Sequence, residues 1–286
     1  MNPTTVTGRL VTEGQRSYLL DEQGNRHFED YPIWDGYIRH WAGKRVHGRL
    51  LPQKDYTEQK EMVILWPAEP RPEPPFVELY YNERLVKYMA SRLGHNAINV
   101  DGGIYNFSHK LNENEIMTEE EYFYRPALGE FAPSPRTGMF EVPAEGLPYY
   151  DKFGRSFMRA IHVLEVKGLD TETLKQYLNA ELQIIHATPP DPRRPAHYAD
   201  FSIWTRSCST IIRDCLQRLG YPKIKGIFPR DLFVSAAWVL QQDSRLRVRV
   251  YLRPQLLVPE APPSVPGPFV NPANLFRQRQ LNYDRP

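Results

Sequence analysis

A proline-rich stretch divides the chain and limits how it can fold. Residues 67–75 read PAEPRPEPP, and proline fixes φ and lacks a backbone donor, so the stretch is expected to run extended as a semi-rigid linker. The 286 residues are enough for two ordinary domains, each with its own core. The predicted organisation is an accessory domain, a linker, a main domain and a proline-rich tail, over residues 1–66, 67–75, 76–253 and 254–286.

The part before the linker predicts a small antiparallel β-barrel of the OB or SH3-like type. Short segments of alternating apolar and polar residues are separated by Gly, Asn and charged turns, at a spacing typical of such barrels. Four aromatic residues between the second and third segments are expected to fill the core or a domain interface, although such barrels also bind glycans or nucleic acids. The segments read TVTGRLVTE, RSYLLDEQG, RVHGRLL and EMVILWP, and the aromatics are Tyr31, Trp34, Tyr37 and Trp41.

Helical and strand patterns alternate after the linker, which predicts a mixed α+β domain. The Asp101-Gly102-Gly103 sequence lies between two alternating segments and indicates a hairpin. A long stretch over 118–155, rich in Gly, Pro and aromatics, is expected to be a loop or lid, and the tail to be extended. The expected helices are 76–94, 170–186, 210–219 and 228–240, and the expected strands are 95–100, 104–108, 156–166 and 245–252.

The chain places a cysteine at the start of one predicted helix. From Thr210 to Leu219 the apolar residues recur at helical spacing, and Gly220 suits the left-handed position after the last turn. Ser207 and Ser209 are both good N-cap types, so Cys208 is expected within a residue of the helix start. Unpaired N–H groups there favour a thiolate and can bind an oxyanion. Cys215 lies two turns further on and is expected to be packing.

A histidine at the head of a predicted strand completes a familiar chemical pattern. His95 begins the strand 95–100, while Cys208 begins a helix. A thiol hydrolase needs a cysteine at a helix N-terminus, an imidazole from a neighbouring strand and a third polar group that orients the ring. The order of these residues along the chain is no obstacle, because such triads are recognised by their geometry.

Several stretches in this order resemble a known family. GHNAINV and IYNFS, then GRSFMRAIHVLEVKGLDTETLKQYL, RSCSTIIRDCL and FPRDLF, resemble the Lnb N-terminal periplasmic domain family. That family is similar to the circularly permuted papain-like (NlpC-type) hydrolases and acyltransferases. Its helix begins with an Asn-Cys-Thr motif, for which this chain has Ser207-Cys208-Ser209.

The resemblance implies a role for each matching residue. Cys208 is the implied nucleophile, His95 the general base and Asn106 the residue that orients His95 from the paired strand. Ser207 and Ser209 flank the nucleophile at the helix N-terminus, where backbone N–H groups form the oxyanion site. Asp101 and His109 are rivals of Asn106, and the hairpin turn and an exposed position are their simpler explanations.

The implied activity is a cysteine-dependent hydrolase or acyltransferase. Its expected substrate is an amide or ester of a bacterial envelope component, either a peptidoglycan peptide or a lipid. The N-terminus lacks a signal-peptide pattern, so the chain is expected to be made in the cytoplasm. One hypothesis is an antibacterial effector delivered to a target periplasm by a specialised secretion system, with an immunity protein as partner. The alternative is an inactive papain-like scaffold whose barrel binds a partner or glycan.

Composition argues against other classes of function. The formal net charge is +2 and charged residues make up 24% of the chain, so no nucleic-acid partner is expected. The 2 cysteines and 8 histidines show no metal-ligand spacing, so neither a metal nor another cofactor is expected. No apolar run approaches the length that spans a bilayer.

Overall fold

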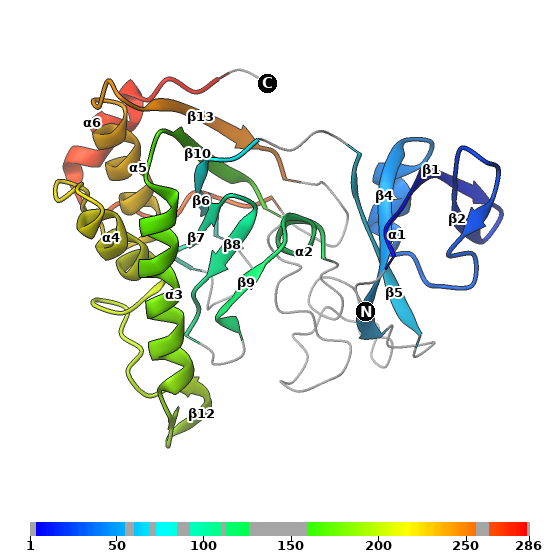
Figure 1. Cartoon of the computed structure of the whole chain (residues 1–286), viewed down its shortest axis with the longest axis horizontal. Coiled ribbons are helices and arrows are strands. Elements are labelled where there is room, and N and C mark those ends of the chain that lie inside the picture. Colours follow the sequence, from blue (N-terminus) through cyan, green and yellow to red (C-terminus); the bar gives the residue numbers. More distant parts are fainter. Residues whose placement is uncertain are drawn as a thin grey trace. The chain divides into compact units, whose positions relative to one another are not determined.

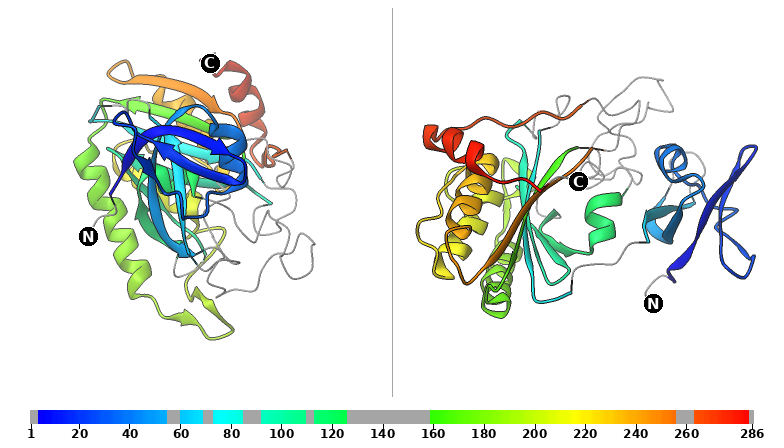
Figure 2. Two further views of the ribbon diagram at one scale, coloured as in Figure 1. Left: turned by 90° about the vertical axis from the view of Figure 1, so that its right-hand side faces the viewer. Right: turned by 90° about the horizontal axis from the view of Figure 1, so that it is seen from above.

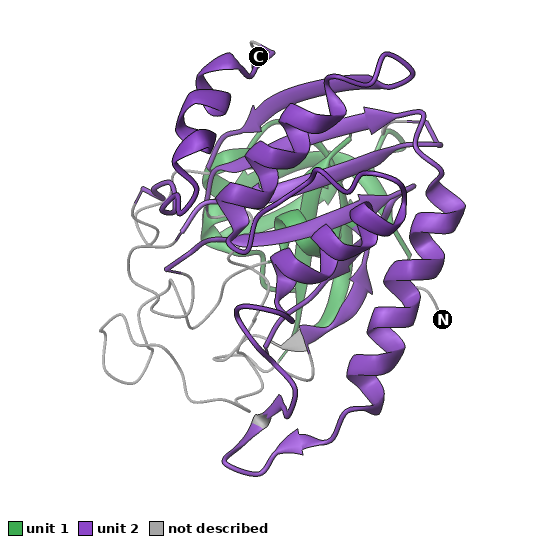
Figure 3. Ribbon diagram, turned by 90° about the vertical axis from the view of Figure 1, so that its left-hand side faces the viewer, with its two compact units in different colours: residues 1–71, 119–158, 256–261 green, residues 72–118, 159–255, 262–286 purple. Residues whose placement is uncertain are grey.

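The protein is a mixed α+β chain whose named strands all pair antiparallel (Figure 1). The computed structural model describes residues 4–54, 60–68, 73–84, 92–109, 113–125, 159–255 and 263–284. The chain forms two compact units (Figure 3). The first unit comprises residues 1–71, 119–158 and 256–261. The second unit comprises residues 72–118, 159–255 and 262–286. Along the chain, the first boundary between the two units lies inside the proline-rich stretch, between Arg71 and Pro72. The later returns to the first unit were not part of the predicted succession of domains.

The first unit contains a five-stranded antiparallel sheet in the order β3-β2-β1-β4-β5. Its four longer strands confirm the four alternating segments seen in the sequence. Two short helices, α1 and α2, belong to the same unit. The elements are β1 (Val6–Glu13), β2 (Arg16–Leu20), β3 (Arg26–His27), α1 (Asp35–Trp41), β4 (Arg45–Lys54), β5 (Glu61–Pro67) and α2 (Glu119–Tyr124).

The predicted closed barrel is wrong. Within the described residues the first unit has an open sheet, with β3 and β5 at its edges. The chain between β3 and β4 forms helix α1 instead of another strand, and β3 has only 2 residues with which to pair. Trp34, Tyr37 and Trp41, in and next to α1, are buried as predicted for core aromatics, whereas Tyr31 is exposed. Helix α1 therefore contributes these buried aromatics, and the strand-like spacing of the flanking segments did not predict this helix.

The second unit has a six-stranded antiparallel sheet in the order β13-β10-β6-β7-β8-β9. Helices α3, α4 and α5 cover one face of this sheet, and α6 packs against α5 (Figure 2). The strands are β6 (Val77–Asn82), β7 (His95–Val100), β8 (Gly103–Asn106), β9 (Glu115–Met117), β10 (Ile161–Lys167) and β13 (Arg247–Arg253). The helices are α3 (Thr171–Ala187), α4 (Cys208–Arg218), α5 (Pro229–Leu240) and α6 (Pro272–Gln280), and a small hairpin pairs β11 (Pro190–Asp191) with β12 (Arg194–Tyr198).

The predicted hairpin at the centre of this sheet is confirmed. β7 and β8 pair antiparallel with Val100 opposite Gly103 and Ala97 opposite Asn106. Asp101 and Gly102 both have positive φ, at 55° and 93°, which a two-residue turn between twisted strands requires. The predicted helices 170–186, 210–219 and 228–240 are confirmed as α3, α4 and α5, and the strand 245–252 as β13.

Two predicted elements were wrong. The expected helix 76–94 begins instead as strand β6, which lies between β10 and β7 and is buried at every position. A short run buried on both sides has no periodicity that separates strand from helix. Residues 85–91 of that element lie outside the described residues, as do 126–155 of the expected lid and 156–158 of the expected strand 156–166. The tail, expected to be extended, contains helix α6, with Asn271 as N-cap and Pro272 in the first turn.

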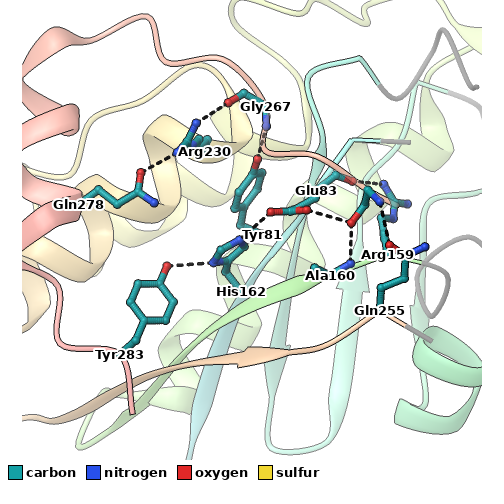
Figure 4. A network of polar contacts seen from close by, with 11 residues as sticks. Tyr81, Glu83, Arg159, Ala160, His162, Arg230, Gln255, Gly267, Gln278 and Tyr283 are labelled. Atoms are coloured by element: carbon teal, nitrogen blue, oxygen red, sulfur yellow. Dashed lines mark hydrogen bonds and ion pairs between the residues drawn. The ribbon is translucent and has the colours of Figure 1, made fainter. Parts of the chain in front are cut away.

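A polar network attaches the C-terminal segment to the second unit (Figure 4). The Ser264 hydroxyl donates to Glu83 at 2.9 Å, and the Gly267 N–H donates to the Tyr81 hydroxyl. His162 lies between Glu83 and Tyr283, at 3.2 Å and 2.9 Å. These partners are largely shielded from solvent, so the segment is an integral part of the unit. In the described part of the chain, no helix is long and apolar enough to cross a membrane.

Substitutions on α3 can test how the second unit is held together. Leu178 is 0% exposed and belongs to the core between sheet and helices, so Leu178→Ala is expected to lower the free energy of unfolding by about 2–5 kcal/mol. Ile184 on the same helix is 47% exposed, and Ile184→Ala is expected to change it by less than about 0.5 kcal/mol. Urea unfolding followed by circular dichroism measures both, and equal effects would contradict the packing described here.

Candidate functional site

The first turn of α4 fixes the position of Cys208. Ser207 is the N-cap residue, and its hydroxyl accepts from the Thr210 N–H while the Ser207 N–H donates to the Thr210 hydroxyl at 2.7 Å. This reciprocal pair is a capping box, which satisfies backbone donors that a helix end leaves without partners. Cys208 is therefore the first residue of the helix, as predicted.

Asn96 joins this helix end to strand β7. The Ser209 hydroxyl donates to Asn96 Oδ1 at 2.9 Å, and the Asn96 amide nitrogen donates to the Tyr80 carbonyl on β6 at 2.9 Å. The Asn96 backbone N–H lies near the Cys208 sulfur and acts to lower the pKa of its thiol. Asn96 and Ser209 are both buried. The thiol is thus held against the backbone of the residue that follows His95.

His95 and Asn106 lie on paired strands and are in direct contact. His95 Nε2 and Asn106 Oδ1 are 2.7 Å apart, and the Asn106 amide nitrogen donates to the Glu113 carbonyl at 2.7 Å. Because that nitrogen must face a carbonyl, the amide oxygen faces His95, and Nε2 is the donor of the pair. In the neutral ring the proton is then on Nε2 and the lone pair is on Nδ1. Asn106 therefore sets both the orientation and the tautomer of His95.

Burial dominates the electrostatics of Cys208. It raises the pKa of the Cys208 thiol, while hydrogen bonds from the Asn96 backbone and from Ser209 act in the opposite direction. The result is opposite to the lowered pKa expected from a helix N-terminus alone, because desolvation disfavours the thiolate more than these donors favour it. The resting site therefore contains a neutral thiol at neutral pH.

The other sequence candidates lie away from this contact. Asp101 is in the β7–β8 turn, where its carboxylate accepts from the Phe76 N–H at 2.8 Å and pairs with Lys175 at 2.7 Å. His109 stacks on His197, with ring centroids 4.8 Å apart. Cys215 is buried in the core, where burial raises its pKa to about 12. The structure thus brings Asn106 to His95, as the resemblance implies.

Sequence reasoning missed Asn96. It contacts α4 through its side chain and the cysteine sulfur through its backbone. The available signal was an amide side chain next to the candidate histidine, in a strand that reads HNAINV. A buried amide needs hydrogen-bond partners, so it indicates a specific contact across the sheet or to a covering helix.

Comparison with family models, with curated proteins and with solved structures finds no match for the chain. Among the described residues, no group of three or more His, Cys, Asp or Glu side chains is arranged to hold a metal ion.

The raised thiol pKa predicts the reactivity of the resting protein. In the Cys215→Ala background, the rate of Cys208 alkylation by iodoacetamide is expected to be low at pH 7 and still rising above pH 8.5, an ordinary thiol pKa. Mass spectrometry of the labelled protein gives the rates, and fast labelling at pH 6 would contradict the neutral resting state.

Proposed function

We propose that the second unit is a thiol enzyme that transfers acyl groups, either to water as a hydrolase or to another acceptor as an acyltransferase. The observation that carries the proposal is the His95–Asn106 hydrogen bond next to the Asn96 backbone that holds the Cys208 sulfur. A nucleophile, a base and an orienting amide are the minimum set for covalent acyl chemistry. Each comes from a regular element, α4, β7 or β8, which keeps their geometry rigid.

The proposed reaction begins with a neutral Cys208 thiol. As the Cys208 sulfur attacks an acyl carbonyl, its proton passes to Nδ1 of His95, while Nε2–H stays hydrogen-bonded to Asn106. The new S–C bond forms a tetrahedral intermediate. When the bond to the leaving group breaks, His95 returns the proton to that group. Water or another acceptor then attacks the thioester, with His95 again accepting a proton, and Cys208 is released.

Backbone N–H groups at the start of α4 are suited to stabilise the intermediate. The first N–H groups of a helix lack intrahelical partners and lie at the positive end of the helix dipole. The N–H groups of Cys208 and Ser209 act to lower the pKa of the Cys208 thiol. The same donors can interact with an oxyanion on the attacked carbon.

The sequence resemblance supports a permuted papain-like arrangement of this site. The histidine strand precedes the cysteine helix along the chain, as in the Lnb-type domains that the motifs resemble. Where that motif has asparagine before the cysteine, Ser207 caps the helix, so the turn keeps its order without the amide. By this resemblance the substrate is an amide or ester of a bacterial envelope peptide or lipid.

The raised pKa of Cys208 favours one alternative. Desolvation raises the pKa of the Cys208 thiol more than its hydrogen bonds lower it. An inert scaffold would also contain such a cysteine, because a packed thiol needs no reactivity. In that case the second unit would only support binding by the first unit. The reactivity of Cys208 toward an acyl donor separates the two functions.

An activated ester tests the acyl chemistry without knowledge of the natural substrate. With a p-nitrophenyl acyl ester, we expect a burst of nitrophenolate and a mass increase of one acyl group on the peptide that contains Cys208. His95→Ala is expected to slow the burst by about 10²- to 10⁴-fold, as for loss of a general base. Asn106→Ala leaves His95 in place but removes the hydrogen bond that orients its ring. The rate of the burst is therefore expected to fall by roughly 10- to 100-fold.

Cys215→Ala is the matched control, because it removes a thiol from the same helix and should leave the burst unchanged. Cys208→Ala should abolish it. Acylation of Cys215 or of lysines instead, or a burst indifferent to His95, would show that Cys208 is inert and would favour the scaffold.

The effector hypothesis makes a separate prediction in cells. With an added export signal, expression of the protein in the periplasm of a test bacterium is expected to slow growth, because envelope amides or esters are attacked. Cys208→Ala should remove the effect at equal expression, measured by growth curves and immunoblotting. Normal growth with the unaltered protein would argue against an envelope substrate.

A further inference from the structure

We propose that one face of the second unit docks onto an anionic lipid bilayer and so presents the Cys208 site to substrates in the membrane surface. The face is formed by two segments with exposed apolar side chains, and we call it the apolar docking face. Single exposed apolar residues are ordinary, but a group of large ones marks an interaction surface. Its members and their exposed fractions are Ile203 37%, Trp204 60%, Val270 60%, Leu275 51% and Phe276 67%.

Contacts through the start of α5 join the two segments. The Trp204 ring lies 5.8 Å from that of Phe228, the residue before α5. Two residues further on, the Arg230 guanidinium lies 3.9 Å from the centroid of the Phe269 ring, next to Val270. Arg230 also donates to the Gly267 carbonyl and to Gln278 on α6 (Figure 4). The turn before α4, the start of α5 and the segment leading into α6 are therefore neighbours.

The same segments flank the residues of the proposed active site. Ile203 and Trp204 lie in a turn closed by the Ser202–Arg206 backbone pair, directly before the N-cap of α4. On the other side, Gly267 packs so closely against Leu93 that an added Cβ would lie 2.6 Å from the Leu93 carbonyl oxygen. Leu93 is two residues before His95. The docking face thus adjoins both the nucleophile helix and the histidine strand.

The charges around this face are mainly positive, and the exposed Asp200 near Ile203 is paired with Arg206. Residues 219–230 and 263–283 contain no aspartate or glutamate, but they contain five cationic side chains. Asp231 is 2% exposed and accepts from the N–H groups of Val270 and Asn271, while Asp284 pairs with Arg249. The cations are Lys223, Lys225, Arg230, Arg277 and Arg279.

An anionic bilayer fits this combination better than a second copy of the chain does. Exposed Leu and Phe side chains beside arginines on one short helix are typical of helices that lie in the bilayer surface. Each cation adds attraction to anionic headgroups. A symmetric dimer through the same face would bring two sets of cations together, which like-charge repulsion opposes. The inference rests on the proposed function only in naming an acyl lipid as the substrate.

Vesicle sedimentation with the full chain tests the docking face. We expect the protein to sediment with vesicles containing phosphatidylglycerol, to remain in the supernatant with pure phosphatidylcholine vesicles, and to dissociate as salt is raised. Leu275→Ser with Phe276→Ser is expected to weaken binding by at least about tenfold, because two apolar side chains no longer enter the bilayer. Arg277→Glu with Arg279→Glu is expected to weaken it by a similar factor.

Matched controls use exposed side chains outside the face. Ile184→Ser removes an exposed apolar residue of α3, and Arg193→Glu with Arg247→Glu makes the same change of charge, so both should sediment like the unaltered protein. Loss of binding in these controls, absence of sedimentation with anionic vesicles, or equal binding to neutral vesicles would overturn the proposal. So would a dimer in analytical ultracentrifugation that Phe276→Ser converts to a monomer, since a second copy would then cover the face.

Sedimentation separates this inference from the proposed chemistry. Cys208→Ala should sediment as the unaltered protein does, since the docking face does not need the thiol. A protein that binds anionic vesicles but never becomes acylated would refute the enzyme and keep the docking face. A protein that is acylated on Cys208 but does not bind anionic vesicles would refute the docking face and keep the enzyme.

Discussion

Asn96 is the residue on which the geometry of the second unit's site depends. Its side chain binds both the Tyr80 carbonyl on β6 and the Ser209 hydroxyl on α4, and its backbone N–H lies near the Cys208 sulfur. A buried amide without partners is costly, so the helix end and the strand are held in one relative position. That position places the thiol next to the strand residue after His95. On the paired strand, Asn106 then orients the histidine ring.

The same enclosure that fixes the thiol also keeps it neutral. Burial opposes the thiolate, and the N–H donors around the sulfur reduce that effect without reversing it. A neutral thiol is less open to nonspecific oxidation and alkylation than a thiolate is. Reaction then depends on proton transfer during attack on a bound acyl group. A membrane surface adjoining the site would supply such groups at high local concentration.

Local patterns predicted the parts of the site well and its assembly less well. The N-cap serines, the Asp101-Gly102 turn and the period of α4 each carry their own structural information, so Cys208 and the β7–β8 hairpin were found. Strand β6 was taken for a helix because it is buried on both faces and shows no period. Asn96 was missed because its partners are Tyr80 and Ser209, the latter 113 residues away. The barrel was predicted from strand spacing, which does not determine whether a sheet closes.

The sequence by itself determined that a cysteine begins a helix, that a histidine begins a strand and that an asparagine follows on the paired strand. These features depend on capping, turn formation and side-chain period, which act over a few residues. Only the tertiary structure decided that α4 packs on β7, that Asn106 reaches His95, and that the C-terminal segment lies beside the site. Those contacts join distant residues, and their energies come from burial and hydrogen bonding that exist only once the sheet and helices are assembled.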